Sequence, residues 1–320
     1  NSALSAEFDG GTGGGIANWG TLTINASAVA NNLASATLPR FYQSNGGGIA
    51  NWGTLALVDS TVDANNTMGR YSAGGGILNL YGDVAVSHST VSGNGAGGGG
   101  GILSLGTLTV SDSVVSDNNA GFGGGGGLFS DGSLTVTDST ISANSVSGFG
   151  SGAGIASVGA LTVSRSTVSD NVGATGQSGG GIFSNGTAMV TSSTVDNNSA
   201  GENGGGIAST GTLTVTGSSV SRNTLASPGN GGGISSNGSL TLTDVTVNQN
   251  SAGGSGGGVS FDASLTLAGA TDIKGNTAGD SGGIYSFLGV VVVSGWTGAV
   301  SDNAPNDCNP PMALGSLVCN

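Results

Sequence analysis

The stretch GGGIASTGTLTVTGSSVSRN, residues 204–223, decides the fold, because variants of it recur along most of the chain. Each copy opens on a glycine triplet and an aliphatic residue, continues with Thr-Leu-Thr-Val or a variant, and closes on an asparagine three positions after an aliphatic residue. The spacing settles at about 25 to 27 residues, and a fixed period in this range indicates a solenoid, propeller or array. The closing asparagines are Asn32, Asn65, Asn94, Asn118, Asn144, Asn171, Asn198, Asn223, Asn250, Asn276 and Asn303.

Apolar residues recur at three fixed positions of the repeat: after the glycine triplet, at the end of the Thr-Leu-Thr-Val run, and before the asparagine. Within the run Thr212–Val215, polar and apolar residues alternate with the period of two that is typical of a strand. Three inward columns predict a three-sided parallel β-helix, in which each strand pairs with its equivalent one coil on, at roughly 4.8 Å per coil. We therefore expect an all-β chain that forms a single β-solenoid of about eleven coils.

The asparagines and glycines of the repeat have structural explanations. Asparagine tolerates left-handed backbone torsions at a corner between strands, and stacked amides bond to one another along the axis. Glycine is needed where a sharp corner requires positive φ and leaves no room for a Cβ beside the next coil. We therefore predict that the asparagine column is a structural ladder. The phosphate-binding interpretation of the glycines has little support, because no Walker lysine or helix-opening G-x-G-x-x-G is present.

Composition excludes some partners. The net charge is −13 with only five Lys plus Arg residues, whereas binding to a phosphate backbone needs a basic stripe. We therefore expect no nucleic-acid partner. The most apolar stretch, residues 284–296, is too short and too interrupted by Ser and Gly to span a bilayer, so no membrane span is expected within these residues.

The chain is expected to consist of an N-terminal edge segment (residues 1–12), the solenoid repeats (13–303) and a C-terminal cap or joining segment (304–320). The last segment holds the two cysteines, Cys308 and Cys319, whose proximity favours a disulfide and hence an extracellular location. Two free thiols are the alternative. The final residues 317–320 repeat the aliphatic-x-x-Asn signature, so this end is in register to pair head to tail with another copy.

The segment between each asparagine and the next glycine triplet varies in length, and insertions of this kind map to one face that often binds partners. The two longest early loops are candidate binding loops. Loops that simply pack over the end of the solenoid explain the same residues. The basic and aromatic side chains in these loops are Arg40, Phe41, Tyr42, Arg70 and Tyr71.

A charged column precedes the Ser-Thr-Val segments, and on successive coils its members would stand roughly 4.8 Å apart. Such a row has the spacing to bind calcium or to place a base for a polysaccharide lyase or hydrolase. It equally forms a solvated row of alternating charge on an outer face, which we favour. The column contains Asp59, His88, Asp112, Asp138, Arg165 and Asp244.

Outward threonine pairs offer a third function class, because flat T-x-T arrays resemble those of ice-binding β-solenoids. The array is interrupted by Ala56, Asp83, Ala85, Ala160 and Met189, and threonine is a good strand former in any case. Ice binding is therefore a lesser alternative. The pairs include Thr21 with Thr23, Thr107 with Thr109, and Thr212 with Thr214.

The G-G-x-I motif followed by aliphatic-x-x-Asn resembles the repeat of polymorphic outer membrane proteins, whose hallmarks are G-G-A-I and F-x-x-N. It is also similar to the repeats of bacterial choice-of-anchor surface proteins. Here Val or Ile replaces the Phe in every copy, and Gly usually replaces the Ala, as in residues 204–207. The resemblance covers residues 13 to about 303. It implies a right-handed parallel β-helix at a bacterial cell surface or secreted from it, in adhesion or structural roles, and it carries no catalytic motif.

Together these observations predict a noncatalytic extracellular structural protein without a cofactor. It would be a subunit that self-associates end to end as a fibre, or a cell-surface adhesin stalk that contacts glycans or a host surface. A β-helical polysaccharide lyase or hydrolase is the main alternative.

Overall fold

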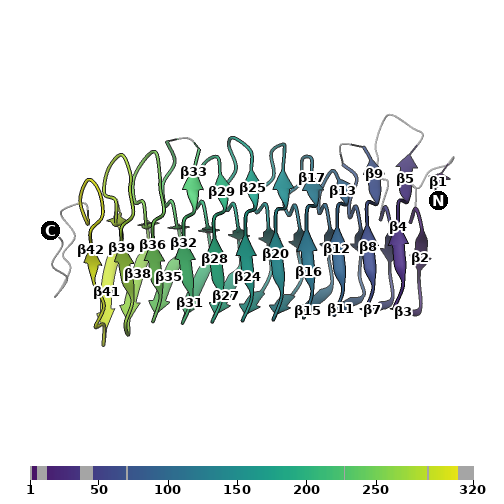
Figure 1. Ribbon diagram of the computed structural model, residues 1–320, viewed down its shortest axis with the longest axis horizontal. Coiled ribbons are helices and arrows are strands. Elements are labelled where there is room, and N and C mark those ends of the chain that lie inside the picture. Colours follow the sequence, from purple (N-terminus) through teal and green to yellow (C-terminus); the bar gives the residue numbers. More distant parts are fainter. Residues whose placement is uncertain are drawn as a thin grey trace. The chain divides into compact units, whose positions relative to one another are not determined.

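The computed structural model describes residues 2–5, 13–36, 46–69, 71–226, 228–286 and 288–308. Every regular element in this part of the chain is a β-strand, and no helix in it is long and apolar enough to cross a membrane. The chain divides into an N-terminal unit, Asn1–Ala160, and a C-terminal unit, Leu161–Asn320. Within each unit, equivalent strands of successive coils lie side by side in parallel sheets (Figure 1).

The N-terminal unit contains four parallel sheets, numbered in the order in which a coil passes through them. The first holds the strands after the glycine triplets: β2 (Ile16–Asn18), β6 (Ile49–Asn51), β10 (Ile77–Asn79), β14 (Ile102–Ser104), β18 (Leu128–Ser130) and β22 (Ile155–Ser157). The second holds the long strands: β3 (Thr21–Asn25), β7 (Thr54–Val58), β11 (Asp83–Ser87), β15 (Thr107–Ser111) and β19 (Leu134–Thr137). The third holds β4 (Ala28–Ala30), β8 (Thr61–Asp63), β12 (Thr90–Ser92), β16 (Val114–Ser116) and β20 (Thr140–Ser142). The fourth holds β1 (Ser2–Ser5), β5 (Leu33–Ala36), β9 (Asn66–Met68), β13 (Gly95–Ala96), β17 (Asn119–Ala120) and β21 (Ser145–Val146).

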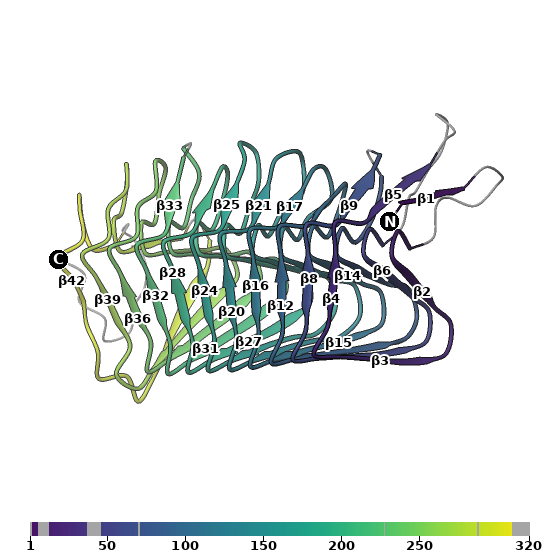
Figure 2. The same cartoon turned by 45° about the vertical axis from the view of Figure 1, so that its right-hand side comes forward.

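The C-terminal unit repeats the same four sheets (Figure 2). Its first sheet holds β26 (Ile182–Ser184), β30 (Ile207–Ser209), β34 (Ile234–Ser236), β37 (Val259–Phe261) and β40 (Ile284–Tyr285). Its second holds β23 (Leu161–Ser164), β27 (Thr187–Thr191), β31 (Thr212–Thr216), β35 (Ser239–Thr243), β38 (Ser264–Ala268) and β41 (Val290–Ser294). Its third holds β24 (Thr167–Ser169), β28 (Thr194–Asp196), β32 (Ser219–Ser221), β36 (Thr246–Asn248), β39 (Asp272–Lys274) and β42 (Val300–Ser301). Its fourth holds β25 (Val172–Gly173), β29 (Ser199–Ala200) and β33 (Thr224–Leu225).

The core consists of aliphatic columns contributed by the first three sheets, which confirms the predicted all-β parallel solenoid. In the C-terminal unit, Ile207, Val215 and Val220 face inward from these sheets and have no exposed surface. Strand pairing keeps the columns in register, so that Ile207 stacks on Ile234 one coil on. Burying each such side chain contributes about 1.5 to 3 kcal/mol, and one coil alone has too few of them to fold.

The fourth sheet extends the predicted three-sided coil. Its strands have only two to four residues. They follow the asparagines and turn a small side chain inward, as Ala120 and Ala200 do, both fully buried. Two residues are too few to display a period of two, so the sequence pattern did not indicate these strands.

The glycine triplets mark a sharp corner, as the sequence analysis expected. Gly204 has a φ of +61°, in the left-handed region. A Cβ added to Gly205 would lie 2.5 Å from the carbonyl oxygen of Gly232 one coil on, and 2.6 Å from that of Thr224. In the incomplete triplet near the C-terminal end, Ser281 replaces the first glycine and still adopts a φ of +53°. The corner therefore needs the left-handed torsion more strictly than it needs glycine.

Candidate functional site

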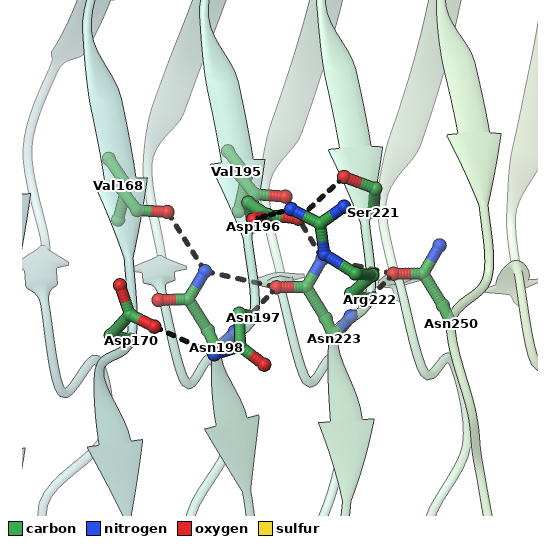
Figure 3. A network of polar contacts seen from close by, with 10 residues as sticks. All are labelled: Val168, Asp170, Val195, Asp196, Asn197, Asn198, Ser221, Arg222, Asn223 and Asn250. Carbon is green, nitrogen blue, oxygen red and sulfur yellow. Dashed lines mark hydrogen bonds and ion pairs between the residues drawn. The ribbon is translucent and has the colours of Figure 1, made fainter.

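The eleven closing asparagines stack into a buried amide ladder within each unit, and each is at most 9% exposed. In the C-terminal unit, Nδ2 of Asn198 donates to Oδ1 of Asn223 at 3.0 Å and to the carbonyl oxygen of Val168 at 2.9 Å (Figure 3). The backbone N–H of Asn198 donates to the same Oδ1 at 2.9 Å. Each internal amide thus uses both of its N–H donors and accepts two hydrogen bonds. The ladder therefore joins neighbouring coils through side chains in addition to the sheets.

The left-handed torsion at this corner lies on a different residue from the one expected. The sequence analysis assigned it to the ladder asparagines, but the residue before each of them adopts positive φ instead. Examples are Asn197 (φ 53°), Arg222 (φ 54°) and Gln249 (φ 55°). The asparagine itself must point inward to reach the next amide, so the preceding residue makes the turn. This assignment of the torsion was wrong.

A polar network lies on the outer side of the same corner in the C-terminal unit (Figure 3). Asp196 accepts hydrogen bonds from the Ser221 hydroxyl, at 2.7 Å, and from the Arg222 guanidinium, both one coil on. Asn197 donates to Asp170 on the preceding coil at 2.7 Å. The Arg222 side chain is 60% exposed, so its ion pair contributes about 1 kcal/mol or less. These contacts cross-link coils at the surface and leave Asp196 committed to neighbouring groups.

The predicted charged column occupies a second left-handed corner, between the long strands and the third sheet. Asp59, His88 and Asp112 all have a φ of 48° and exposed side chains. Asp138, Arg165 and Asp244 occupy the same corner, with φ between 47° and 54°. Among the described residues, no group of three or more His, Cys, Asp or Glu side chains is placed to hold a metal ion. The frequent aspartates of this column fit the left-handed torsion, which Asp and Asn tolerate better than most residues.

A serine follows each of these corner residues in most coils, and the serines form a third polar column. The backbone N–H of Ser60 donates to Oγ of Ser89 at 3.0 Å, and Oγ of Ser89 donates to the carbonyl oxygen of Ser87 at 2.7 Å. The same contacts continue in the other unit, where the N–H of Ser193 donates to Oγ of Ser218. Both corners of the third sheet are thus tied to the next coil by side chains.

The C-terminal end of the amide ladder is closed by a carboxylate. Oδ1 of Asp307 accepts the hydrogen bonds that a further asparagine would accept, from the backbone N–H of Asn303 at 3.0 Å and from its Nδ2 at 2.8 Å. Cys308 forms a parallel bridge to Ile284 at the edge of the first sheet and is disulfide-bonded. Its predicted partner, Cys319, lies outside the described residues. Residues 304–308 thus cap one corner of the last coil.

The candidate binding loops lie only partly in the described chain. Arg40, Phe41, Tyr42 and Arg70 fall outside it, whereas Tyr71 is 68% exposed. The sequence analysis did not single out Phe122 and Phe149, which lie in later loops of the N-terminal unit and are 40% and 81% exposed. Their rings are 6.4 Å apart. The loops after β9 and β17 project from the same side of this unit (Figure 1).

A second column of asparagine side chains, at the last residue of the first-sheet strands, was not predicted from the sequence. Nδ2 of Asn18 donates to Oδ1 of Asn51 at 2.7 Å, Asn51 donates to Asn79 at 2.8 Å, and Asn79 donates to Oγ of Ser104 at 3.0 Å. Serine then holds the position, and Oγ of Ser130 is buried without a hydrogen-bond partner in the structure. Only three copies carry the asparagine, two positions after an isoleucine, so the signal was short.

Compared with known protein families, curated proteins and solved structures, the chain gives no significant match. The buried polar groups described above face other coils of the same chain, and the charged groups lie mainly at exposed turns. This arrangement holds coils together along the stacking direction.

Proposed function

We propose that this chain is a noncatalytic structural protein outside the cell, a β-solenoid that forms a cell-surface stalk of the adhesin type. The observation that carries the proposal is the amide ladder, from Asn32 to Asn144 in one unit and from Asn171 to Asn303 in the other. The polar side chains of an active site face a substrate, whereas the polar side chains of this ladder bond to neighbouring coils. Buried, satisfied polar networks of this kind add rigidity and specify one register.

Two features of the C-terminal end support the location and the stalk form. The disulfide at Cys308 is typical of proteins that fold in an oxidising compartment. The cap formed by Asp307 and Cys308 occupies the place of a further coil at one corner, which opposes stacking of another coil at that corner. A bacterial source remains part of the proposal through the resemblance of the repeats.

Surface composition supports a contact role for the N-terminal unit. The corner after its first-sheet strands carries Trp19, 67% exposed, which stacks on Trp52 with ring centroids 4.9 Å apart and planes inclined by 7°. Tyr81 and Leu105 continue this corner and are 81% and 40% exposed. Equivalent corners of the C-terminal unit carry polar residues: Asn185, Thr210, Asn237 and Asp262. An adhesin stalk needs one region that contacts a partner and another that stays solvated.

End-to-end assembly into a fibre is a second candidate, because the last long strand is apolar on its outer face. Val290 and Val292 in β41 are 60% and 46% exposed, whereas the equivalent residues of β38 are Ser264 and Thr266. Exposed apolar residues on an edge strand favour pairing with another chain. The cap at Asp307 opposes such pairing at one corner, and we therefore rank the fibre second.

Negative-stain microscopy of the purified full chain tests the proposal. The stalk predicts isolated particles at all concentrations, and the fibre predicts axial filaments that Val292→Lys abolishes. An assay against a panel of polysaccharides tests the enzyme alternative at the same time. Depolymerisation that is lost in Asp112→Ala or Asp138→Ala would refute the noncatalytic role.

A further inference from the structure

The outer face of the first sheet in the C-terminal unit contains a run of small residues between two aromatic rings. Strand register aligns Phe183 with Ala208, Ala208 with Ser235, Ser235 with Ser260, and Ser260 with Tyr285. These positions point away from the core, since the residues on either side of them in each strand face inward. Four strand spacings of about 4.8 Å place the two rings roughly 19 Å apart. We call the surface from Phe183 to Tyr285 the small-residue trough.

A hollow of about 60 Å³ lies in the trough beside Phe183. Ala208 and Ser235 line it from the sheet, although they are only 4% and 9% exposed, because loops and corners rise on both sides. Asn203 lines it from the loop side and Asn237 from the corner side. The hollow is therefore a recess walled by amides, with one aromatic ring at its end.

Three coils of the N-terminal unit carry large side chains where the trough has small ones. Its outer face has Leu78, Leu103 and Phe129 on three successive coils, in the positions that correspond to Ala208, Ser235 and Ser260. Leu78 is 1% exposed, so large side chains fill the space between loop and corner there. These three coils are filled where the trough has small residues, whereas Ala50 and Ala156 of the same unit are small and as buried as Ala208.

We propose that the small-residue trough binds a neutral polysaccharide segment. No charged side chain lines the hollow among the described residues, and a net charge of −13 disfavours polyanions. The ring of Phe183 offers an apolar surface to the C–H face of a sugar, while amides and hydroxyls both donate and accept hydrogen bonds, as sugar hydroxyls do. The hollow spans three coils, about 10 Å, and the row of small residues continues beyond it to Tyr285, which suits an extended chain of sugars better than a single compact ligand.

Isothermal titration of the full chain with hexasaccharides of β-1,4-linked glucose, mannose and N-acetylglucosamine tests this site. We expect at least one of them to bind, and polygalacturonate fragments not to bind. Ser235→Leu, which copies the filled state of the other unit, should weaken binding at least tenfold, and Phe183→Ala should do the same. Asn237→Ala, at an exposed corner, should weaken it about threefold. The matched control Ala17→Leu places the same bulk at the equivalent position of the first coil and should bind as the wild type does.

Two results would overturn the proposal: no binding of any neutral hexasaccharide, or wild-type affinity in both Phe183→Ala and Asn237→Ala. Melting curves from circular dichroism show which variants fold, and Asn237→Ala keeps the test valid if Ser235→Leu does not. The trough goes beyond the stalk role. Isolated particles that bind no sugar would refute sugar binding at the trough and leave the proposed stalk role intact. Filaments that bind sugar would refute the stalk role and support sugar binding.

Discussion

Two columns of stacked asparagine amides join coils of this protein, and one of them is much longer than the other. At the corner after the third sheet, an asparagine closes every coil, and each internal amide has its hydrogen bonds satisfied by neighbouring coils. At the end of the first-sheet strands, the amides run only from Asn18 to Asn79 and then pass to Ser104. Serine is shorter than asparagine, so the chain of side-chain bonds ends, and Ser130, Ser184 and Ser209 are left buried without a partner in the structure.

The difference shows what a stacked amide requires. An asparagine reaches both the coil before and the coil after it, so it stabilises the stack only where both neighbours offer the matching atom. A column of serines satisfies itself where the hydroxyl can reach a carbonyl of its own turn, as Ser89 does. At the end of the first sheet only some serines do so: the hydroxyls of Ser157 and Ser236 donate to the carbonyl oxygens of Gly159 and Gly238, at 3.5 and 3.3 Å. The complete column is thus the one whose interruption should cost most.

Breaking the complete column should have the largest effect. Asn198→Ala removes the acceptor of two donors on Asn171, its Nδ2 at 2.9 Å and its backbone N–H at 3.1 Å. Leaving buried donors unpaired costs about 1 to 3 kcal/mol each, so we expect the free energy of unfolding to fall by about 4 kcal/mol. Urea denaturation measures this change. Asn237→Ala, at an exposed corner, is the control and should change stability by less than about 0.5 kcal/mol.

Removing the carboxylate that ends this column should have a smaller effect. Asp307→Ala leaves the Asn303 backbone N–H and Nδ2 without their acceptor and should cost about 2 kcal/mol. Asp307→Asn keeps the acceptor oxygen and should stay within about 0.5 kcal/mol of the wild type. Hydrogen exchange at the Asn303 amide gives a local readout beside the urea midpoint. Equal losses in both variants would show that the negative charge matters more than the hydrogen bonds.

The sequence predicted those features that repeat in every copy, because a column of like residues is visible without coordinates. The three aliphatic columns, the strand class and the parallel stacking are of this kind. Features that depend on one or two coils were not predictable in the same way. Asp307 takes the place of a ladder asparagine only once, after the last coil. The change from asparagine to serine, where the Asn79 amide donates to Ser104, also occurs only once.

The candidate sites show a second limit of prediction from sequence. A recurring residue type does not reveal whether its backbone is left-handed. The row that contains Asp59 and His88 was weighed as a calcium or catalytic row and as a solvated row, and its members share a left-handed backbone corner that the sequence did not indicate. The small-residue trough was missed for the opposite reason. Ala208, Ser235 and Ser260 share no chemical signature, and their significance appears only when register places them between two rings.

Shortening the incomplete column should cost less than breaking the complete one. Asn51→Ser removes the donor to the Asn79 amide, at 2.8 Å, and to the carbonyl oxygen of Gly53, at 2.7 Å. Serine is tolerated at this position in later coils, and its hydroxyl can still accept from Asn18. We expect a loss of about 1.5 kcal/mol in urea denaturation. A loss as large as that of Asn198→Ala would contradict the view that this column depends less on its amides.

Extending the incomplete column should give the smallest effect, and one of opposite sign. Ser104→Asn would keep the acceptor for Asn79 and bring an N–H donor toward the buried hydroxyl of Ser130, which has no partner in the structure. The coil after Asn51 has a glycine, Gly82, at this corner, and a Cβ there would lie only 3.2 Å from the Asn51 amide nitrogen. The coil after Ser104 also has a glycine at this corner, Gly132. The space that an asparagine needs is therefore present at this corner.

We expect Ser104→Asn to raise the free energy of unfolding by about 1 kcal/mol, the usual net contribution of one added hydrogen bond. The matched variant Ser104→Leu adds similar bulk without the donor, and it should destabilise the protein because it also removes the acceptor of the Asn79 amide. Urea midpoints of the two variants separate hydrogen bonding from packing. If both variants destabilise the protein equally, the column ends at Ser104 for lack of space, and the serines beyond it are part of the packing of these coils.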